Sequence, residues 1–224
     1  MSNLLMNASR PALAAAIILV LAAGAASAKE GIVQCGNLIY ARDRTSKCFS
    51  DEFLRRVEKE TSIRTERTFK AVKLDGDDLY EFPFTIMTGE NDFVLSQGER
   101  DKLKDYLSRG GFLLASAGCS SIEWDRAFRR EIKRIFPGRE MKPIAMTHPI
   151  FRTVFNVTQI HLKSATAGKV LLEGLEIDGK IVMIYSPQGL NDTAHTSGCC
   201  CCGGNEVRNS LEINVNVLAY ALLH

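Results

Sequence analysis

The chain alternates short, continuous apolar segments with longer segments in which apolar residues recur every three or four positions. Continuous apolar runs bounded by glycines or turn residues indicate buried strands, and the longer spacing indicates amphipathic helices. The expected strands are residues 37–41, 65–74, 82–88, 112–116, 170–177 and 180–186, and the expected helices are residues 50–60, 96–110, 124–136 and 206–223.

Local signals mark the ends of several of these elements. Ser96 and Glu99 form a capping-box pattern at a helix start, and Asp178-Gly179 between two apolar runs is a strong hairpin signal. Strands that alternate with helices predict a parallel sheet with helices on both faces. We therefore expect an α/β fold, a three-layer sandwich with a mostly parallel sheet and a hairpin near the C-terminal end.

The first 28 residues have the features of a secretory signal peptide. Arg10 precedes an apolar run over residues 12–23, and Ala26-Ser27-Ala28 is a small-residue cleavage pattern. The run is shorter than the roughly 20 apolar residues that a membrane span needs. The alternative to a cleaved signal peptide is that this segment stays on the protein as an N-terminal anchor. We expect residues 29–224 to form a single domain without a transmembrane span, and the mature protein to be periplasmic or secreted.

The composition is that of an ordinary globular protein, with 46% hydrophobic and 24% charged residues and a formal net charge of +2. This near balance of charge gives no indication of nucleic-acid binding. The chain has seven cysteines, and outside the reducing cytoplasm some of them are expected to form disulfides. Cys35 and Cys48 are a candidate pair.

Cys119 follows the buried strand that begins after Gly110-Gly111 and stands just before a predicted helix. A thiol at the carboxyl end of a strand and near a helix N-terminus has a lowered pKa, and backbone N–H groups there could bind an oxyanion. Cys119 is therefore a candidate catalytic nucleophile. The alternatives are a small buried cysteine that packs against the strand end, or a disulfide to residues 199–202; the sequence shows no partnered base.

A second candidate site follows the expected strand at residues 82–88. Residues 89–92 stand at its carboxyl end, where open α/β sheets bind ligands. Glu90 and Asp92 could orient a ligand or serve as acid and base, although Asn91 and Asp92 are also typical turn residues. The candidate ligand-binding residues are Gly89, Glu90, Asn91, Asp92, Gly118 and Ser120.

Residues 199–202 are four consecutive cysteines between glycines. Thiolates suit Zn²⁺ or Cu(I), but neighbouring side chains diverge, so four consecutive sulfur atoms cannot easily meet at one point. Cys199, Cys202 and His195, with Cys119, form a geometrically better set of metal ligands. The alternative to metal binding is that these thiols are unstructured or that one or two disulfides hold this loop. Apart from a possible Zn or Cu ion at this site, we expect no cofactor.

A series of short motifs covers most of the mature chain in a specific order. They are Phe82-Pro83-Phe84, Thr88-Gly89, Leu95-Ser96, Tyr106-Leu107, Gly110-Gly111-Phe112-Leu113, Asp125-Arg126-Ala127-Phe128-Arg129-Arg130-Glu131, Ile135-Phe136-Pro137, His148-Pro149-Ile150-Phe151 and Asn214-Val215-Asn216-Val217-Leu218-Ala219-Tyr220-Ala221-Leu222. In these motifs the chain resembles a bacterial family, domain of unknown function 4159. The resemblance implies a flavodoxin-like fold similar to that of class I glutamine amidotransferases, and it implies no established reaction.

The amidotransferases carry a nucleophilic cysteine, often within Gly-x-Cys-x-Gly, and a strand-borne histidine with a glutamate close behind it. Here Gly118-Cys119-Ser120 matches the first half of that motif, but Ser121 replaces the second glycine. Neither His148 nor His195 has a glutamate two residues downstream. The triad that the resemblance implies is therefore incomplete.

We expect an exported amidotransferase-like domain, non-enzymatic or degenerate, that binds a ligand or an envelope protein at the carboxyl edge of its sheet. Relatives often occur within larger membrane-associated proteins, so the resemblance also implies assembly partners. One alternative is a cysteine-dependent hydrolase or amidase that uses Cys119. The other is a metal- or redox-responsive protein that uses the cysteines at 199–202.

Overall fold

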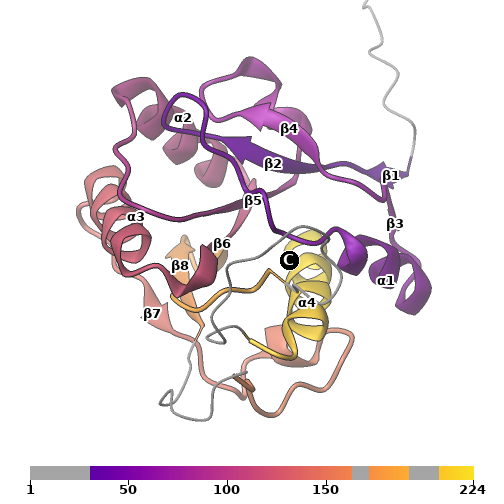
Figure 1. Cartoon of the computed structure of the whole chain (residues 1–224). Coiled ribbons are helices and arrows are strands. Elements are labelled where there is room, and N and C mark those ends of the chain that lie inside the picture. The colour runs from indigo at the N-terminus through magenta and orange to yellow at the C-terminus, as the bar shows by residue number, and fades with distance from the viewer. Residues whose placement is uncertain (1–30, 163–171, 192–206) are drawn as a thin grey trace, which may run out of the picture. The chain divides into compact units, whose positions relative to one another are not determined.

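The computed structural model describes residues 31–162, 172–191 and 207–224 (Figure 1). Across these ranges no helix is both long and apolar enough to cross a membrane. The predicted signal peptide at residues 1–28 lies outside the described residues and stays a prediction.

A seven-stranded sheet forms the middle layer of the domain. Its strands are β2 (Cys35–Ile39), β4 (Lys70–Lys73), β5 (Phe84–Gly89), β6 (Phe112–Ala117), β7 (Lys142–Pro143), β8 (Glu173–Ile177) and β9 (Lys180–Ser186). The strand order is β4-β2-β5-β6-β9-β8-β7. The first five strands in this order are parallel, whereas β8 is antiparallel to both of its neighbours. A separate pair, β1 (Ile32–Val33) and β3 (Arg64–Thr65), forms a small parallel sheet.

Four α-helices accompany the sheet in the described part of the chain, with three short 3₁₀ helices. They are α1 (Glu52–Glu60), α2 (Gln97–Ser108), α3 (Ile122–Ile135), α4 (Ser210–Leu223), η1 (Asp77–Glu81), η2 (Gly118–Ser120) and η3 (Pro149–Arg152). Helices α2 and α3 pack on one face of the sheet, and α1 and α4 pack together on the other (Figure 1). The mixed α/β architecture with a mostly parallel sheet is therefore confirmed.

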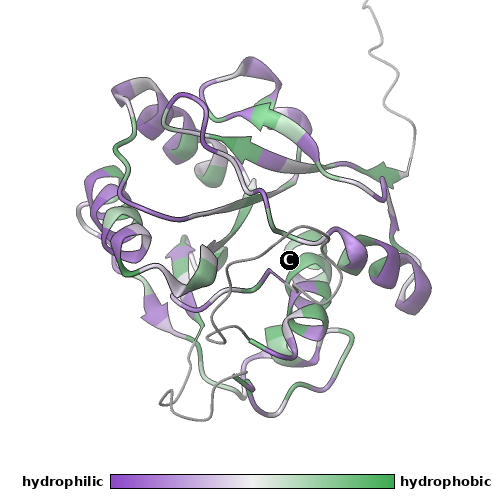
Figure 2. Cartoon of the chain, in the orientation of Figure 1, coloured by the Kyte–Doolittle hydropathy of each residue, from purple (hydrophilic) through white to green (hydrophobic). Residues whose placement is uncertain are grey.

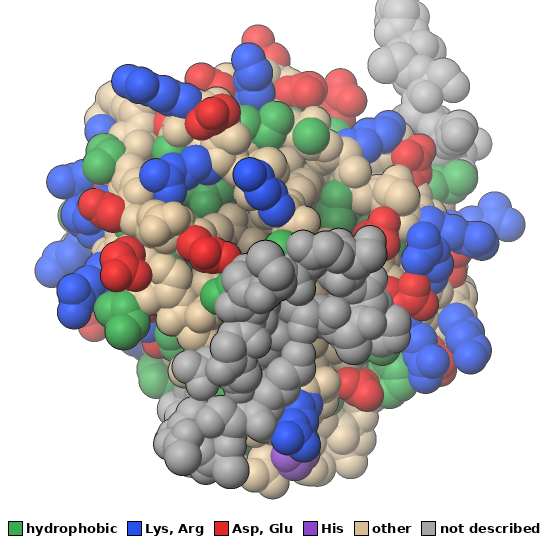
Figure 3. All heavy atoms as spheres, in the orientation of Figure 1, with side chains coloured by type: hydrophobic (Ala, Val, Ile, Leu, Met, Phe, Trp, Pro, Cys, Tyr) green, Lys and Arg blue, Asp and Glu red, His purple; other side chains and the backbone are tan. Residues whose placement is uncertain are grey.

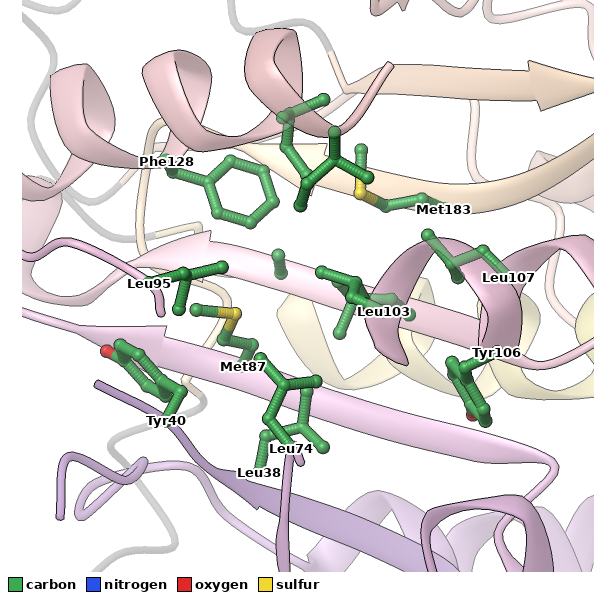
Figure 4. Packing of buried hydrophobic residues seen from close by; sticks show 14 of the residues in the cluster. Leu38, Tyr40, Leu74, Met87, Leu95, Leu103, Tyr106, Leu107, Phe128 and Met183 are labelled. Carbon is green, nitrogen blue, oxygen red and sulfur yellow. The ribbon is translucent and has the colours of Figure 1, made fainter. Parts of the chain in front are cut away.

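Two hydrophobic clusters fill the space between these layers. Figure 4 shows the cluster under α2 and α3, to which Met87 of β5, Met183 of β9, Leu103 of α2 and Phe128 of α3 contribute. In Figure 2 the outward surfaces of α1, α2 and α3 are mainly hydrophilic, as expected for helices that bury one face. The apolar periodicity of the sequence thus corresponds to two cores on opposite faces of one sheet.

The predicted elements are found with small shifts at their ends. The Ser96 side chain accepts from the backbone N–H of Glu99 and the Glu99 carboxylate accepts from that of Ser96, so the predicted capping box is present. Asp178-Gly179 joins β8 and β9 as the predicted hairpin turn. The single strand expected at residues 65–74 is instead two short strands in different sheets, β3 and β4.

Cys35 lies in β2 and is fully buried. It is a free thiol, so the predicted disulfide with Cys48 is wrong. Burial raises the pKa of the Cys35 thiol to about 12, because a thiolate would lose its hydration there. Cys35 is therefore a small apolar core residue at this position.

Candidate functional site

The strand order creates one place where chain connections leave in opposite directions. From β2 the chain continues through α1 to β4 on one side, whereas from β5 it continues through α2 to β6 on the other side. Diverging connections leave a crevice at the carboxyl ends of the two neighbouring strands, and this is where open α/β sheets bind ligands. The topology therefore points to the ends of β2 and β5.

A cavity of about 360 Å³ lies at this point. Its walls come from the segment after β2, from the ends of β5 and β6, and from the segment after β9. The lining residues are Tyr40, Asp43, Arg44, Thr45, Lys47, Cys48, Thr88, Gly89, Glu90, Asn91, Gly118 and Asn191. Acidic and basic side chains are interspersed over the face of the molecule shown in Figure 3, and the described residues form no broad patch of one charge on that face.

A buried hydrogen-bonded pair supports the base of the cavity. The indole Nε1 of Trp124 donates to the hydroxyl of Tyr40 at 2.8 Å, and that hydroxyl donates to the carbonyl oxygen of Thr88 at 3.0 Å. Burial raises the pKa of Tyr40 to about 12. A Cβ atom at Gly89 would lie 2.2 Å from the Tyr40 hydroxyl, so this strand end requires glycine.

Cys119 occupies a tight turn between β6 and α3. Its backbone is left-handed, with φ 49° and ψ 24°, and Ser120 follows with φ 54°; this conformation is costly for residues with a Cβ atom. Ser121 then caps α3 by accepting a hydrogen bond from the backbone N–H of Trp124. The predicted position of the thiol, between a strand end and a helix start, is confirmed.

The sulfur of Cys119 donates a hydrogen bond to Oε1 of Glu90 at 3.2 Å. Cys119 is partly exposed and carries a thiol, so the alternatives of a sealed apolar cysteine and of a disulfide do not describe it. Glu90 lines the cavity and Cys119 does not. The carboxylate thus connects the thiol to the cavity, and it is within reach to accept a proton from sulfur.

Of the six predicted ligand-binding residues, four line the cavity, whereas Asp92 and Ser120, the last residue of η2, do not. Gly89, Glu90, Asn91 and Gly118 line the cavity. Asp92 instead pairs with Arg130 of α3, with Nη2 and Oδ1 2.9 Å apart, and this arginine lowers the pKa of the carboxyl.

Sequence reasoning missed most of the cavity wall, including three polar residues that matter for binding: Tyr40, Arg44 and Asn191. Each lies just beyond a strand, after β2 or after β9. Ligands gather at the carboxyl ends of parallel strands, and β2 and β9 end at the same edge of the sheet as β5 and β6.

The metal-binding prediction stays untested in the structure. His195, Cys199 and Cys202 lie outside the described residues. Within the described ranges, no group of three or more His, Cys, Asp and Glu side chains is placed to hold a metal ion.

His148 lines a different cavity, beside β8 and Tyr220 of α4. Its Nδ1 caps η3 by accepting a hydrogen bond from the backbone N–H of Ile150 at 3.2 Å.

The fold and the cavity define an α/β domain with a candidate ligand site at the carboxyl edge of a mostly parallel sheet. The family model described as Domain of unknown function (DUF4159) matches residues 37–222, and the chain belongs to this family. No curated protein matches the chain.

Proposed function

We propose that this chain is a ligand-binding domain, non-enzymatic or a degenerate relative of the class I glutamine amidotransferases. Its ligand occupies the cavity at the ends of β2 and β5. The observation that carries the proposal is this cavity of about 360 Å³, which is in the size range of small-molecule sites. The buried Oδ1 of Asn191 in its wall supports it, because that atom has no hydrogen-bond partner among the described residues.

The strand order supports the same proposal. Counted along the chain, the five parallel strands have the order 2-1-3-4-5, which is the order of flavodoxin-like domains. In such domains the ligand binds where the order reverses, and the cavity lies at the corresponding pair of strands, β2 and β5. Together with the expected signal peptide, the strand order supports an exported domain that binds a small molecule or a protein of the cell envelope.

The proposal is tested by recovering a bound small molecule. Wild-type protein is mixed with small molecules extracted from bacterial periplasm, separated by gel filtration, denatured, and analysed by mass spectrometry. The Thr45→Phe variant places a ring in the cavity wall, and Thr68→Phe places the same ring at an exposed position elsewhere. We expect a compound that is enriched by wild type and Thr68→Phe but not by Thr45→Phe. No enrichment, or equal enrichment by all three folded proteins, would reject the proposal.

The contact between Cys119 and Glu90 favours a second candidate, a cysteine-dependent hydrolase or amidase. In this scheme the sulfur attacks an ester or amide carbonyl while Glu90 takes the thiol proton. Glu90 then passes the proton to the leaving oxygen or nitrogen, and water hydrolyses the thioester. Because a carboxylate is a weak base for a thiol, this scheme is the less favoured of the two.

p-Nitrophenyl acetate tests the hydrolase candidate. The hydrolase requires turnover that is abolished in Cys119→Ala and slowed at least about tenfold in Glu90→Gln, as for loss of a general base. Acetylation no faster than that of a cysteine-containing peptide, without turnover, would reject the hydrolase and leave the binding proposal standing.

A further inference from the structure

The cavity at the ends of β2 and β5 contains an arginine that forms no ion pair with any of the described residues. Arg44 lines the cavity, and its Nη1 donates to the carbonyl oxygen of Glu90 at 3.1 Å. No carboxylate of the described residues lies within ion-pair distance of Arg44. By contrast, Arg129 of α3 is held by two hydrogen bonds to Glu173, each 2.8 Å long.

A second group in the same wall is a hydrogen-bond acceptor for which the described residues provide no donor. Asn191 is only 2% exposed, and its backbone carbonyl is fixed by the N–H of Ser50 at 3.0 Å. Its side-chain Oδ1 accepts no hydrogen bond within the described part of the chain. A buried acceptor without a donor is unfavourable, so a ligand N–H or O–H at this atom would remove an existing cost.

The remaining polar groups of the wall are engaged or exposed. The Tyr40 hydroxyl both donates and accepts within the protein, and Glu90 Oε1 accepts from Cys119. Asp43 and Lys47 are exposed, where solvent and salt screen their charges. Arg44 and Asn191 are therefore the two groups best placed to choose a ligand.

We propose that the cavity binds a small organic anion, a carboxylate or a phosphate monoester, which also carries a hydroxyl or N–H donor. The anionic group pairs with Arg44, and the donor bonds Asn191 Oδ1. A guanidinium is well suited to both kinds of anion because its N–H groups match their oxygen atoms. This inference rests on the proposed ligand-binding function and specifies the chemistry of its ligand.

The single tryptophan of the chain provides the measurement. Trp124 is hydrogen-bonded to Tyr40 in the cavity wall, so occupancy of the cavity is expected to change its fluorescence. Wild-type protein is titrated with L-lactate and its neutral analogue L-lactamide, and with glycerol 3-phosphate and glycerol. Calorimetry on the same solutions detects binding that leaves the fluorescence unchanged.

We expect one of the two anions to bind saturably, and its neutral analogue to bind at least about tenfold more weakly, as for loss of a charge-assisted hydrogen bond. Which anion binds distinguishes a carboxylate ligand from a phosphate ligand. The Arg44→Gln variant should bind this anion more weakly than wild type does, by a similar factor. Arg109→Gln, a matched change at an exposed arginine at the end of α2, should bind as wild type does.

A further comparison tests Asn191. Acetate has no donor for its Oδ1, so a preference for lactate over acetate should disappear in Asn191→Leu. Equal binding of anion and neutral analogue, an unchanged affinity in Arg44→Gln, or no binding of either anion would overturn the inference. If the periplasmic compound is still recovered by wild type and not by Thr45→Phe, the proposed function survives that result and only the ligand class is wrong.

Discussion

The thiol of Cys119 and the carboxylate of Glu90 are in hydrogen-bond contact although 29 positions separate them in the sequence. Strands β5 and β6 run side by side in parallel, with Gly89 opposite Ala117. The residues that follow each strand therefore emerge at the same edge of the sheet. The left-handed backbone at Cys119 occurs at this point of contact.

The backbone conformation of Cys119 gives a first prediction. Glycine adopts a left-handed conformation without the Cβ penalty of about 1 kcal/mol or more. Cys119→Gly should therefore be about 1 kcal/mol more stable to urea unfolding than Cys119→Ala, which also lacks the thiol. Equal stability of the two variants would show that the turn is relaxed in solution.

Gly89 gives a second prediction. An alanine Cβ there would lie 2.2 Å from the Tyr40 hydroxyl and 2.8 Å from Nε1 of Trp124. Gly89→Ala should cost about 2 kcal/mol or more, because the ring must move and two buried hydrogen bonds are disturbed. The emission of Trp124 should shift with it.

Gly138 provides the control for this change. It follows α3, and a Cβ atom there would meet nothing within 4 Å. Gly138→Ala should change the free energy of unfolding by no more than about 0.5 kcal/mol. Similar losses for the two glycines would contradict the close packing of Tyr40 and Trp124 against β5.

The buried thiol of Cys35 predicts a loss of stability in alkaline solution. Its pKa is raised from 9.0 to about 12 by burial, so the unfolded chain releases this proton first as the pH rises. The contribution of the buried thiol to the free energy of unfolding is complete below pH 9. It decreases between pH 9 and 12, by about 1.4 kcal/mol per pH unit. Urea unfolding of wild type and Cys35→Ala at pH 8 and 11 should therefore give a smaller difference at the higher pH; parallel curves would refute the assignment.

His148 predicts a change in the opposite pH range. Burial and the charge of His224 lower its pKa, and its Nδ1 must be unprotonated to accept from the backbone N–H of Ile150. The stability that this contact supplies is present above pH 6.5 and is lost as the pH falls through the lowered pKa. His148→Asn keeps an acceptor without a titrating group, so its thermal unfolding should depend less on pH between 7 and 5 than that of wild type.

The sequence predicts the four α-helices and most of the longer strands of this fold because their signals are local. Apolar spacing, the capping box at Ser96 and the turn at Asp178-Gly179 each act over a few residues, and the structure contains all of them. The cavity depends on strand order, which no local pattern encodes. Arg44 and Asn191 are 147 positions apart in the chain (191 − 44), and they line one cavity only because β2 and β9 end at the same edge of the sheet.

Buried polar side chains in α4 show a further limit of sequence patterns. Asn216 is 1% exposed and bonds the backbone of Val154 and Phe155 through its amide. Asn214 is buried as well and donates to the carbonyl oxygen of Leu190. Polar residues within an apolar helix suggest an exposed face, and their partners become apparent only when the distant loops are in place.

The two outer strands of the seven-stranded sheet are poor templates for another strand. At one edge β7 consists of Lys142 and Pro143, and proline has no N–H to donate. At the other edge β4 carries exposed Lys70 and Lys73, and charged lysines oppose edge-to-edge pairing. Any protein that binds this domain is therefore expected to recognise side chains on its surface, and these two edges disfavour the joining of copies through a continuous sheet.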